Sequence, residues 1–146
     1  GFPPILRKGA AVSDGESEFA IPNKQVLSVA IVSRPGMMQQ SLRALLCAQP
    51  WITVAAVLGD GLTAMNHVAQ HKPALLIIDC NLLDEEVAAL LAALHAGQWP
   101  TRCLVLTRSD QRTTRALASG ADAAMLRDSS LPELLAILSR FHTEQI

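Results

Sequence analysis

The sequence has few aromatic residues, few charges and no long apolar segment, and each shortage excludes a class of protein. Of the 146 residues, 3% are aromatic, 17% are charged, and the net charge is −1. A nearly neutral chain does not attract a phosphate backbone, so we expect no direct binding of nucleic acid. No apolar run reaches the roughly 20 residues that a membrane-spanning helix needs. The N-terminus also lacks the basic and apolar regions of a signal peptide.

Cysteine is scarce, and glycine-rich nucleotide loops are missing. The three cysteines, Cys47, Cys80 and Cys103, form no C-x-x-C pair, and each lies in or beside an apolar run. We therefore expect buried, reduced thiols and a cytoplasmic protein. No G-x-G-x-x-G motif follows an apolar run, which excludes the usual dinucleotide-binding loop.

The composition and periodicity of the sequence divide it into an arm, one domain and a tail. Residues 1–25 mix proline, glycine, serine and charges without a period, which is typical of an arm or linker. Gly1 is the kind of residue that a cleaved tag leaves behind. We place a single domain at residues 26–141 and a tail at residues 142–146, where a linker to an output domain would start.

Short apolar runs alternate with segments of helical spacing throughout the domain. We predict strands at 26–32, 52–58, 74–79, 102–107 and 122–126, with helices after each of them. Asp84 and Ser130 are predicted helix N-caps, and Gly97 and Gly120 are predicted C-terminal caps. This order predicts an α/β fold, with a five-stranded parallel doubly wound sheet between two layers of helices.

In such a fold the carboxyl ends of all strands meet at one edge, where ligands and reactive groups belong. The sequence delivers a set of polar and glycine residues to that edge: Ser33, Arg34, Gly59, Asp60, Asp79, Thr107, Arg108, Arg127 and Asp128. Asp79 follows the most apolar strand, where a carboxylate is costly to bury without a partner. It is either an acceptor of a structural ion pair or cap, or a nucleophile for phosphoryl transfer.

Four stretches carry a resemblance to a known family. They are VAIVSRPGMMQQSLRALL, PALLIIDCNLLDEE, RCLVLTRSD and GADAAMLRDSSLPELL. In this order they resemble the receiver domain of bacterial response regulators, particularly the NarL/LuxR-type branch. The resemblance extends from about Val26 to Phe141. It implies a flavodoxin-like fold and a role in two-component signal transduction, phosphorelay and transcription regulation.

The resemblance also implies roles for individual residues. In that family two acidic residues after the first strand hold Mg²⁺, and a central aspartate accepts a phosphoryl group from a histidine kinase. A Thr or Ser after the fourth strand contacts the phosphoryl oxygens, and a Lys follows the fifth. The phospho-acceptor position is Asp79 and the hydroxyl position is Thr107. Ser33 and Arg34 replace the acidic pair, and Arg127 replaces the Lys.

These replacements predict that magnesium binding is lost, and we expect neither a metal site nor any other cofactor. At an effective dielectric of about 20, unit charges about 4 Å apart repel by roughly 4 kcal/mol, and a divalent cation beside Arg34 meets roughly twice that. Mg²⁺ also requires several oxygen ligands. We expect Arg34 or Arg127 to pair with Asp79 instead, since a guanidinium suits a carboxylate.

The main hypothesis is an atypical, non-enzymatic receiver without catalytic residues, which acts through contacts with protein partners or a second copy of itself. A C-terminal helix-turn-helix output domain would lie outside this chain, and no membrane is involved. One alternative is a receiver that still accepts a phosphoryl group on Asp79. Another is a receiver that senses a small anion through Arg34, Arg108, Arg127 and Thr107.

Two further pairs of residues could have a function but are more simply explained by packing. His67 and His71 have a spacing that can hold zinc, but no third ligand is evident, so we expect them to lie against the edge of the core. Trp51 and Trp99 both lie next to prolines in connections before strands, where packing is their expected role.

Overall fold

The computed structural model describes residues 26–145, and the predicted arm at residues 1–25 lies outside this range. The described part contains five strands and five helices in alternation. They are β1 (Leu27–Val32), α1 (Met37–Cys47), β2 (Ile52–Leu58), α2 (Gly61–His71), β3 (Leu75–Ile78), α3 (Asp84–Gly97), β4 (Arg102–Thr107), α4 (Asp110–Ala118), β5 (Ala123–Leu126) and α5 (Leu131–Glu144). None of these helices is long and apolar enough to span a membrane.

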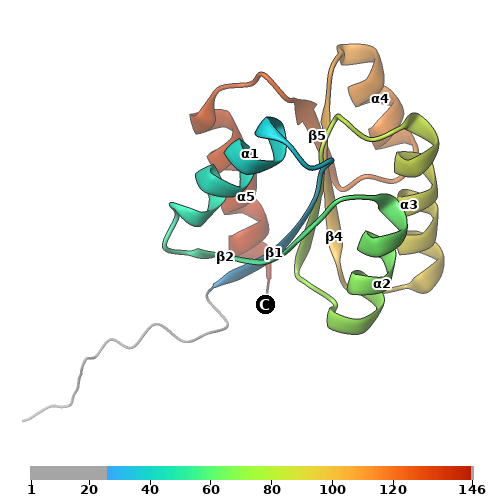
Figure 1. Cartoon of the computed structure of the whole chain (residues 1–146), viewed down its shortest axis with the longest axis horizontal. Coiled ribbons are helices and arrows are strands. Elements are labelled where there is room, and N and C mark those ends of the chain that lie inside the picture. The colour runs from blue at the N-terminus through green and yellow to red at the C-terminus, as the bar shows by residue number, and fades with distance from the viewer. Residues whose placement is uncertain (1–25, 146) are drawn as a thin grey trace, which may run out of the picture.

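The strands form one parallel sheet in the order β2-β1-β3-β4-β5, as predicted. Helices α1 and α5 cover one face, and α2, α3 and α4 cover the other, which gives the three layers visible in Figure 1. β3 lies in the centre between β1 and β4. The residue that follows β3 is therefore placed at the middle of the carboxyl edge, between the ends of its neighbours.

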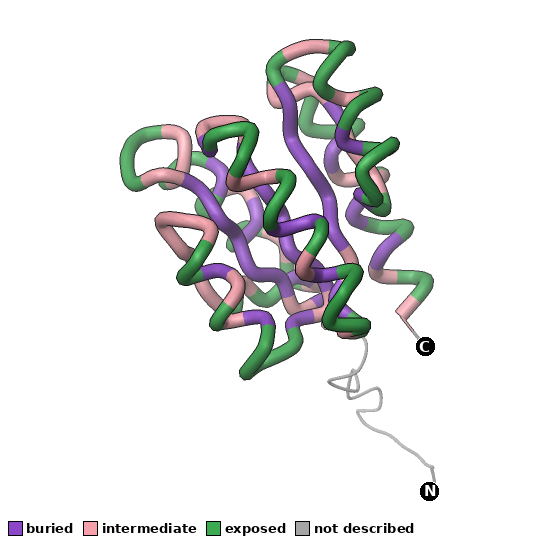
Figure 2. The backbone as a smooth tube through the Cα atoms, turned by 90° about the vertical axis from the view of Figure 1, so that its right-hand side faces the viewer, coloured by how far each residue is buried: buried purple, intermediate pink, exposed green. Residues whose placement is uncertain are grey.

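The strands are buried on both faces because their apolar residues alternate between two cores. In β3, Leu75 and Ile77 pack toward α1 and α5, whereas Leu76 and Ile78 pack toward α2, α3 and α4. All four side chains are 0% exposed. Figure 2 shows the same burial as a continuous purple tube along the central strands. Sheets covered on both sides favour such uninterrupted apolar runs.

The helix boundaries confirm some predicted caps and correct others. Ser130 caps α5 by accepting a hydrogen bond from the backbone N–H of Glu133, as predicted. Asp84 is not an N-cap, since Leu83 holds that place and Asp84 is the first residue of α3. At the end of α3 the left-handed residue is Gln98, with φ 51°, and not Gly97. Gly120 does adopt a positive φ after α4.

Two other predictions need correction. Helix α5 continues to Glu144, so most of the tail predicted at residues 142–146 is helical.

Of the three cysteines only Cys103 is buried, while Cys80 is half-buried and Cys47 is exposed. Cys47 is the last residue of α1, where the helix face turns away from the sheet. Burial raises the pKa of the Cys103 thiol well above its usual range, which keeps that thiol protonated.

The two histidines of α2 form a tilted ring pair. The ring centroids of His67 and His71 lie 4.6 Å apart, and His67 Nε2 is buried without a hydrogen-bond partner among the described residues. Both histidines were expected to lie against the edge of the core. His67 is half-buried, as expected, whereas His71 is exposed. Burial and the neighbouring His71 lower the pKa of His67 below its ordinary value of 6.5.

This pair predicts a loss of stability in mild acid. Because the folded-state pKa of His67 lies below 6.5, the unfolded chain binds the proton first, and folding stability falls as the pH drops through the interval between the two values. We expect His67→Leu to flatten the dependence of the free energy of unfolding on pH between about 7.5 and 5.5, measured by urea titration. Gln70→Leu, at an exposed position of the same helix, is the control and should keep the original slope. An equal slope in His67→Leu would contradict this assignment.

Candidate functional site at the carboxyl edge of the sheet

Asp79 directly follows β3 and is the only carboxylate of the described residues that is fully buried, with an exposed fraction of 0%. Its backbone N–H donates to Val32 O at 2.9 Å, which continues the ladder between β3 and β1. Both carboxylate oxygens accept hydrogen bonds. Oδ1 accepts from the backbone N–H of Cys80 at 2.8 Å and from Arg127 at 2.9 Å. Oδ2 accepts from the Ser33 hydroxyl at 2.7 Å.

Arg127 is the charged partner of Asp79. Its Nε donates to Asp79 Oδ1, and its Nη2 donates to Met38 O at 3.1 Å in the first turn of α1. The backbone N–H of Arg127 donates to Thr107 O at 2.8 Å, so the end of β4 holds the residue in place. The prediction that Arg34 or Arg127 pairs with Asp79 is confirmed for Arg127. Its side chain is 23% exposed and joins β3, β5 and α1 around one buried charge.

Ser33 is fully buried and supplies the second anchor of the carboxylate. It donates to Asp79 and in turn accepts a hydrogen bond from Asn81 Nδ2 at 3.1 Å. Asn81 also accepts from the backbone N–H of Arg34 at 3.0 Å, so this amide connects the end of β1 to the loop after β3. Asn81 was not among the predicted site residues. Its place two residues after Asp79 was the only signal in the sequence.

Arg34 does not reach Asp79 and forms a separate ion pair with Glu86 of α3. Its Nη1 also donates to Gly59 O at 3.1 Å. Glu86 accepts further from the backbone N–H groups of Leu83 at 3.0 Å and Gly61 at 3.2 Å. Of the two arginines, Asp79 is therefore paired with Arg127 alone. Glu86 was not among the predicted site residues.

Thr107 and Arg108, at the end of β4, are turned away from the carboxylate. The Thr107 hydroxyl lies 2.5 Å from the Thr113 hydroxyl and within 3.3 Å of Met125 O and Ser109 O. Arg108 Nε donates to Cys80 O at 3.2 Å. The structure thus brings Ser33, Asp79 and Arg127 together and leaves Arg34 and Thr107 beside them with partners of their own.

The residues present do not fit a magnesium ion. Mg²⁺ favours octahedral oxygen ligation, usually by one or two carboxylates with water. Asp79 offers one carboxylate, which already accepts three hydrogen bonds, and a guanidinium follows Ser33 in the sequence. Within residues 26–145, no group of three or more His, Cys, Asp or Glu residues gathers in a way that could hold a metal ion.

The Asp79–Arg127 contact predicts a large effect on stability when only one partner is removed. Arg127→Ala leaves a buried carboxylate without its charged donor, and we expect it to lower the free energy of unfolding by about 2–3 kcal/mol. In an Asp79→Asn background Arg127→Ala should lower the free energy of unfolding by clearly less, since no buried charge is left without a partner. Chemical denaturation of the four proteins of this cycle measures the difference.

Arg115→Ala is the matched control for the loss of an arginine. Its 3.8 Å pair with Asp84 is exposed, so the change should stay within about 0.5 kcal/mol. Equal losses from Arg127→Ala in both backgrounds would mean that the guanidinium stabilises the fold without regard to the charge of Asp79.

Comparisons with known proteins agree with this architecture. No family model matches the sequence, and no curated protein sequence is similar to it. Solved structures do match. The signal receiver domain of the response regulator NarL from Mycobacterium tuberculosis is 21% identical, with a TM-score of 0.74 over 82% of this chain and 98% of that one. A DNA-binding response regulator of the LuxR family from Staphylococcus aureus is 19% identical, with a TM-score of 0.71 over 80% of this chain and 99% of the other.

A longer protein also matches. The response regulator RcsB from Salmonella enterica serovar Typhimurium, solved with promoter DNA and the phosphomimetic BeF3⁻, is 15% identical, with a TM-score of 0.69. The match covers 81% of this chain and 61% of RcsB. At these identities the likeness concerns the fold, and it confirms the predicted one: residues 26–145 adopt the flavodoxin-like fold of response-regulator receiver domains, including those of the NarL and LuxR type.

Proposed function

We propose that this chain is an atypical receiver domain that takes part in signal transduction and transcription regulation without being phosphorylated by the magnesium-dependent route. The observation that carries the proposal is the occupation of both Asp79 oxygens by donors of the protein itself. Arg127, Ser33 and the Cys80 N–H fill the positions from which a metal ion and an incoming phosphoryl group would have to approach. The residue that resembles a phospho-acceptor acts here as a structural anion.

Phosphoryl transfer to Asp79 would have to overcome these contacts. An attacking carboxylate oxygen is held either by Ser33 or by Arg127 and Cys80, and the Asp79 side chain has no exposed surface. The transferred group carries negative charge that phosphoryl-transfer sites neutralise with metal ions and cationic side chains. Arg34 is the nearest other cation of the loop after β1, and it is already paired with Glu86. No free positive charge of that loop is left to replace the metal.

A site held in this way fixes one conformation of the surrounding segments. Arg127 ties the end of β5 to the end of β3 and to Met38 in α1, and Arg34 ties the loop after β1 to α3. In a receiver these segments would rearrange on phosphorylation, so a permanent ion pair makes the surface independent of a kinase. We infer that the domain works in the cytoplasm as a non-enzymatic module, through contacts with protein partners or a second copy.

The output is proposed by analogy with the matched regulators. RcsB is bound to promoter DNA, and this chain covers 61% of it, which leaves room in that protein for a second domain. We propose that this receiver likewise regulates a C-terminal helix-turn-helix domain outside the chain described here. The net charge of −1 supports a regulatory rather than a DNA-contacting role for the receiver itself.

The sensing of a small anion at the strand ends is less well supported. Arg34, Arg108 and Arg127 would form the cradle, but Arg34 and Arg127 are already in ion pairs with Glu86 and Asp79. An anion at this place would also have to approach the buried charge of Asp79.

Intact-mass measurement after incubation with Mg²⁺ and acetyl phosphate tests the proposal. We expect no gain in mass for the native chain and none for Asp79→Asn. The triple variant Ser33→Asp, Arg34→Asp, Arg127→Lys restores the residue types expected of a magnesium-dependent receiver, and it should gain one phosphoryl group that is lost again when Asp79→Asn is added.

A phosphoryl group on the native chain, absent from Asp79→Asn, would overturn the proposal and favour the phosphorylatable alternative. Circular dichroism of the triple variant serves as a folding control, because Arg34→Asp also breaks the pair with Glu86. If the triple variant is unfolded, Arg127→Lys alone and Ser33→Asp alone are tested for a phosphoryl gain on Asp79 instead, since each leaves the Arg34–Glu86 pair in place.

A further inference from the structure

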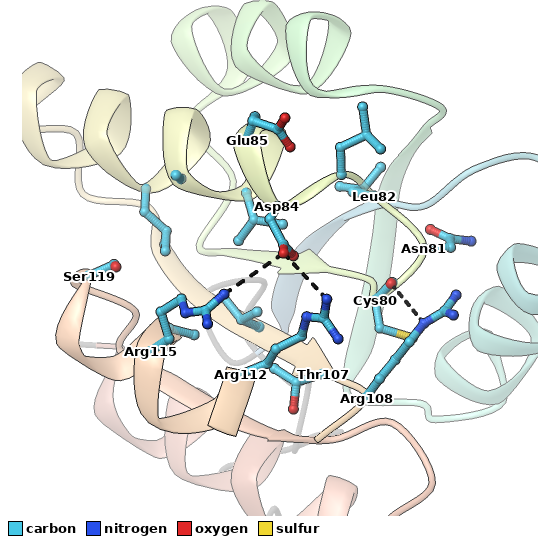
Figure 3. A pocket seen from close by; sticks show the side chains of 16 residues that line it. Cys80, Asn81, Leu82, Asp84, Glu85, Thr107, Arg108, Arg112, Arg115 and Ser119 are labelled. Atoms are coloured by element: carbon cyan, nitrogen blue, oxygen red, sulfur yellow. Dashed lines mark hydrogen bonds and ion pairs between the residues drawn. The ribbon is translucent and has the colours of Figure 1, made fainter. Parts of the chain in front are cut away.

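A groove beside the Asp79 site, lined by Cys80, Asn81 and Thr107 among others, has no role in the function proposed so far. It runs between α3 and α4, with a volume of about 420 Å³, and is drawn in Figure 3. This volume falls within the roughly 300–1,000 Å³ that is typical of pockets for small molecules. Small residues are among those that line the groove, namely Ala88 of α3, Ala116 of α4 and Ser119 after it.

The floor of the groove is apolar. Val87 and Leu91 line it from α3, Val105 from β4 and Ala116 from α4. These side chains belong to, or pack against, the core on this face of the sheet, so the floor is rigidly supported. An apolar body placed on it would remove apolar surface from water, which is the main source of affinity for small ligands in such pockets.

The rim of the groove carries three arginines. Arg112 and Arg115 of α4 converge on the same oxygen, Asp84 Oδ2, at 3.4 Å and 3.8 Å, as the dashed lines of Figure 3 show. Arg108 lies nearer the sheet and donates only through Nε, to Cys80 O. The side chains of Arg112, Arg115 and Asp84 are about half exposed, at 49%, 58% and 55%. Exposed pairs with such long distances are weak and readily exchanged.

From this combination we infer that the α3–α4 groove binds a small amphipathic anion, an organic molecule with an apolar body and a carboxylate, sulfonate or phosphate headgroup. The headgroup meets Arg108 and Arg112, which line the groove and whose planar guanidinium groups each have more donors than the one bonded to Cys80 or Asp84, and the apolar body covers the floor. Asp84 holds the arginines in place while the groove is empty and yields them to the ligand. Three arginines against Asp84 and Glu85 leave the lining with a surplus positive charge.

Cys80 joins the groove to the Asp79 site. Cys80 accepts from Arg108 through its carbonyl and donates to Asp79 Oδ1 through its N–H. A headgroup that draws Arg108 away from Cys80 O therefore frees the Cys80–Asn81 peptide, which is next in the chain to the peptide whose N–H supports the buried carboxylate. The groove supplies an input that needs no phosphoryl group. This coupling rests on the proposed function, whereas the binding itself does not.

Fluorescence titration with anilinonaphthalene sulfonate, an aromatic molecule with one sulfonate group, tests the site on the full chain. We expect saturable binding to the native protein. Ala88→Trp fills the groove and should weaken binding at least about 10-fold, which corresponds to about 1.4 kcal/mol. Ala89→Trp is the matched control, because Ala89 is an exposed neighbour on α3 that does not line the groove, and it should bind like the native chain.

The charged part of the site is tested separately. Arg108→Gln with Arg112→Gln should weaken binding about 10-fold and reduce its sensitivity to salt, whereas Arg43→Gln, at an exposed position of α1, should do neither. Sodium octanoate should displace the probe, while sulfate alone and octanol alone should not at the same concentrations, since each supplies only half of the recognised chemistry.

Equal binding by Ala88→Trp and Ala89→Trp would overturn the site, as would equal binding by the double glutamine variant and Arg43→Gln. Thermal unfolding of each variant shows whether it is folded, and only folded variants are compared. The result is independent of the phosphorylation assay. Binding in the groove together with a phosphoryl gain on Asp79 would reject the proposed function alone, and no binding together with no gain would reject only the groove.

Discussion

The rest of the site depends on the burial of one carboxylate. Asp79 ends the central strand with no exposed surface, in a position where an unpaired charge would cost several kcal/mol. The protein meets that cost with the guanidinium of Arg127, the hydroxyl of Ser33 and one backbone N–H. Because these donors come from the ends of β5, β1 and β3, neutralising the charge also fixes how the three strand ends lie.

The need to pair each charge also explains the position of Arg34. A second arginine beside Arg127 would repel it, yet Arg34 turns outward and finds Glu86, whose carboxylate also caps α3 and receives the N–H of Gly61. Two arginines are thus neutralised by two carboxylates in separate pairs, one buried and one half-buried. Each of these two pairs is balanced in charge, which is consistent with the absence of an acidic pair after β1.

Much of this arrangement could be predicted from the sequence. The alternation of apolar runs and helical segments fixes the strands, and the parallel sheet then brings Ser33, Asp79 and Arg127 to one edge. What escaped prediction depends on the reach of side chains across loops. Glu86 was not among the predicted site residues, because only the folded loops bring Arg34 to it. Asp84 failed as an N-cap because Glu86 folds back on the N–H of Leu83 and sets the start of α3 one residue earlier.

A site whose cation is a side chain of the same chain, such as Arg127, responds to different signals from a site whose cation is a bound metal ion. Occupation by a metal ion rises and falls with the free concentration of that ion, since binding stabilises a state by RT ln(1 + [L]/Kd). A guanidinium attached to the same chain is always present at its partner, and arginine stays charged at every physiological pH. On the function proposed above, a carboxylate held by Arg127 reports neither metal nor phosphodonor. The proposed input is then a surface such as the α3–α4 groove, where the ion pairs of Asp84 with Arg112 and Arg115 are exposed.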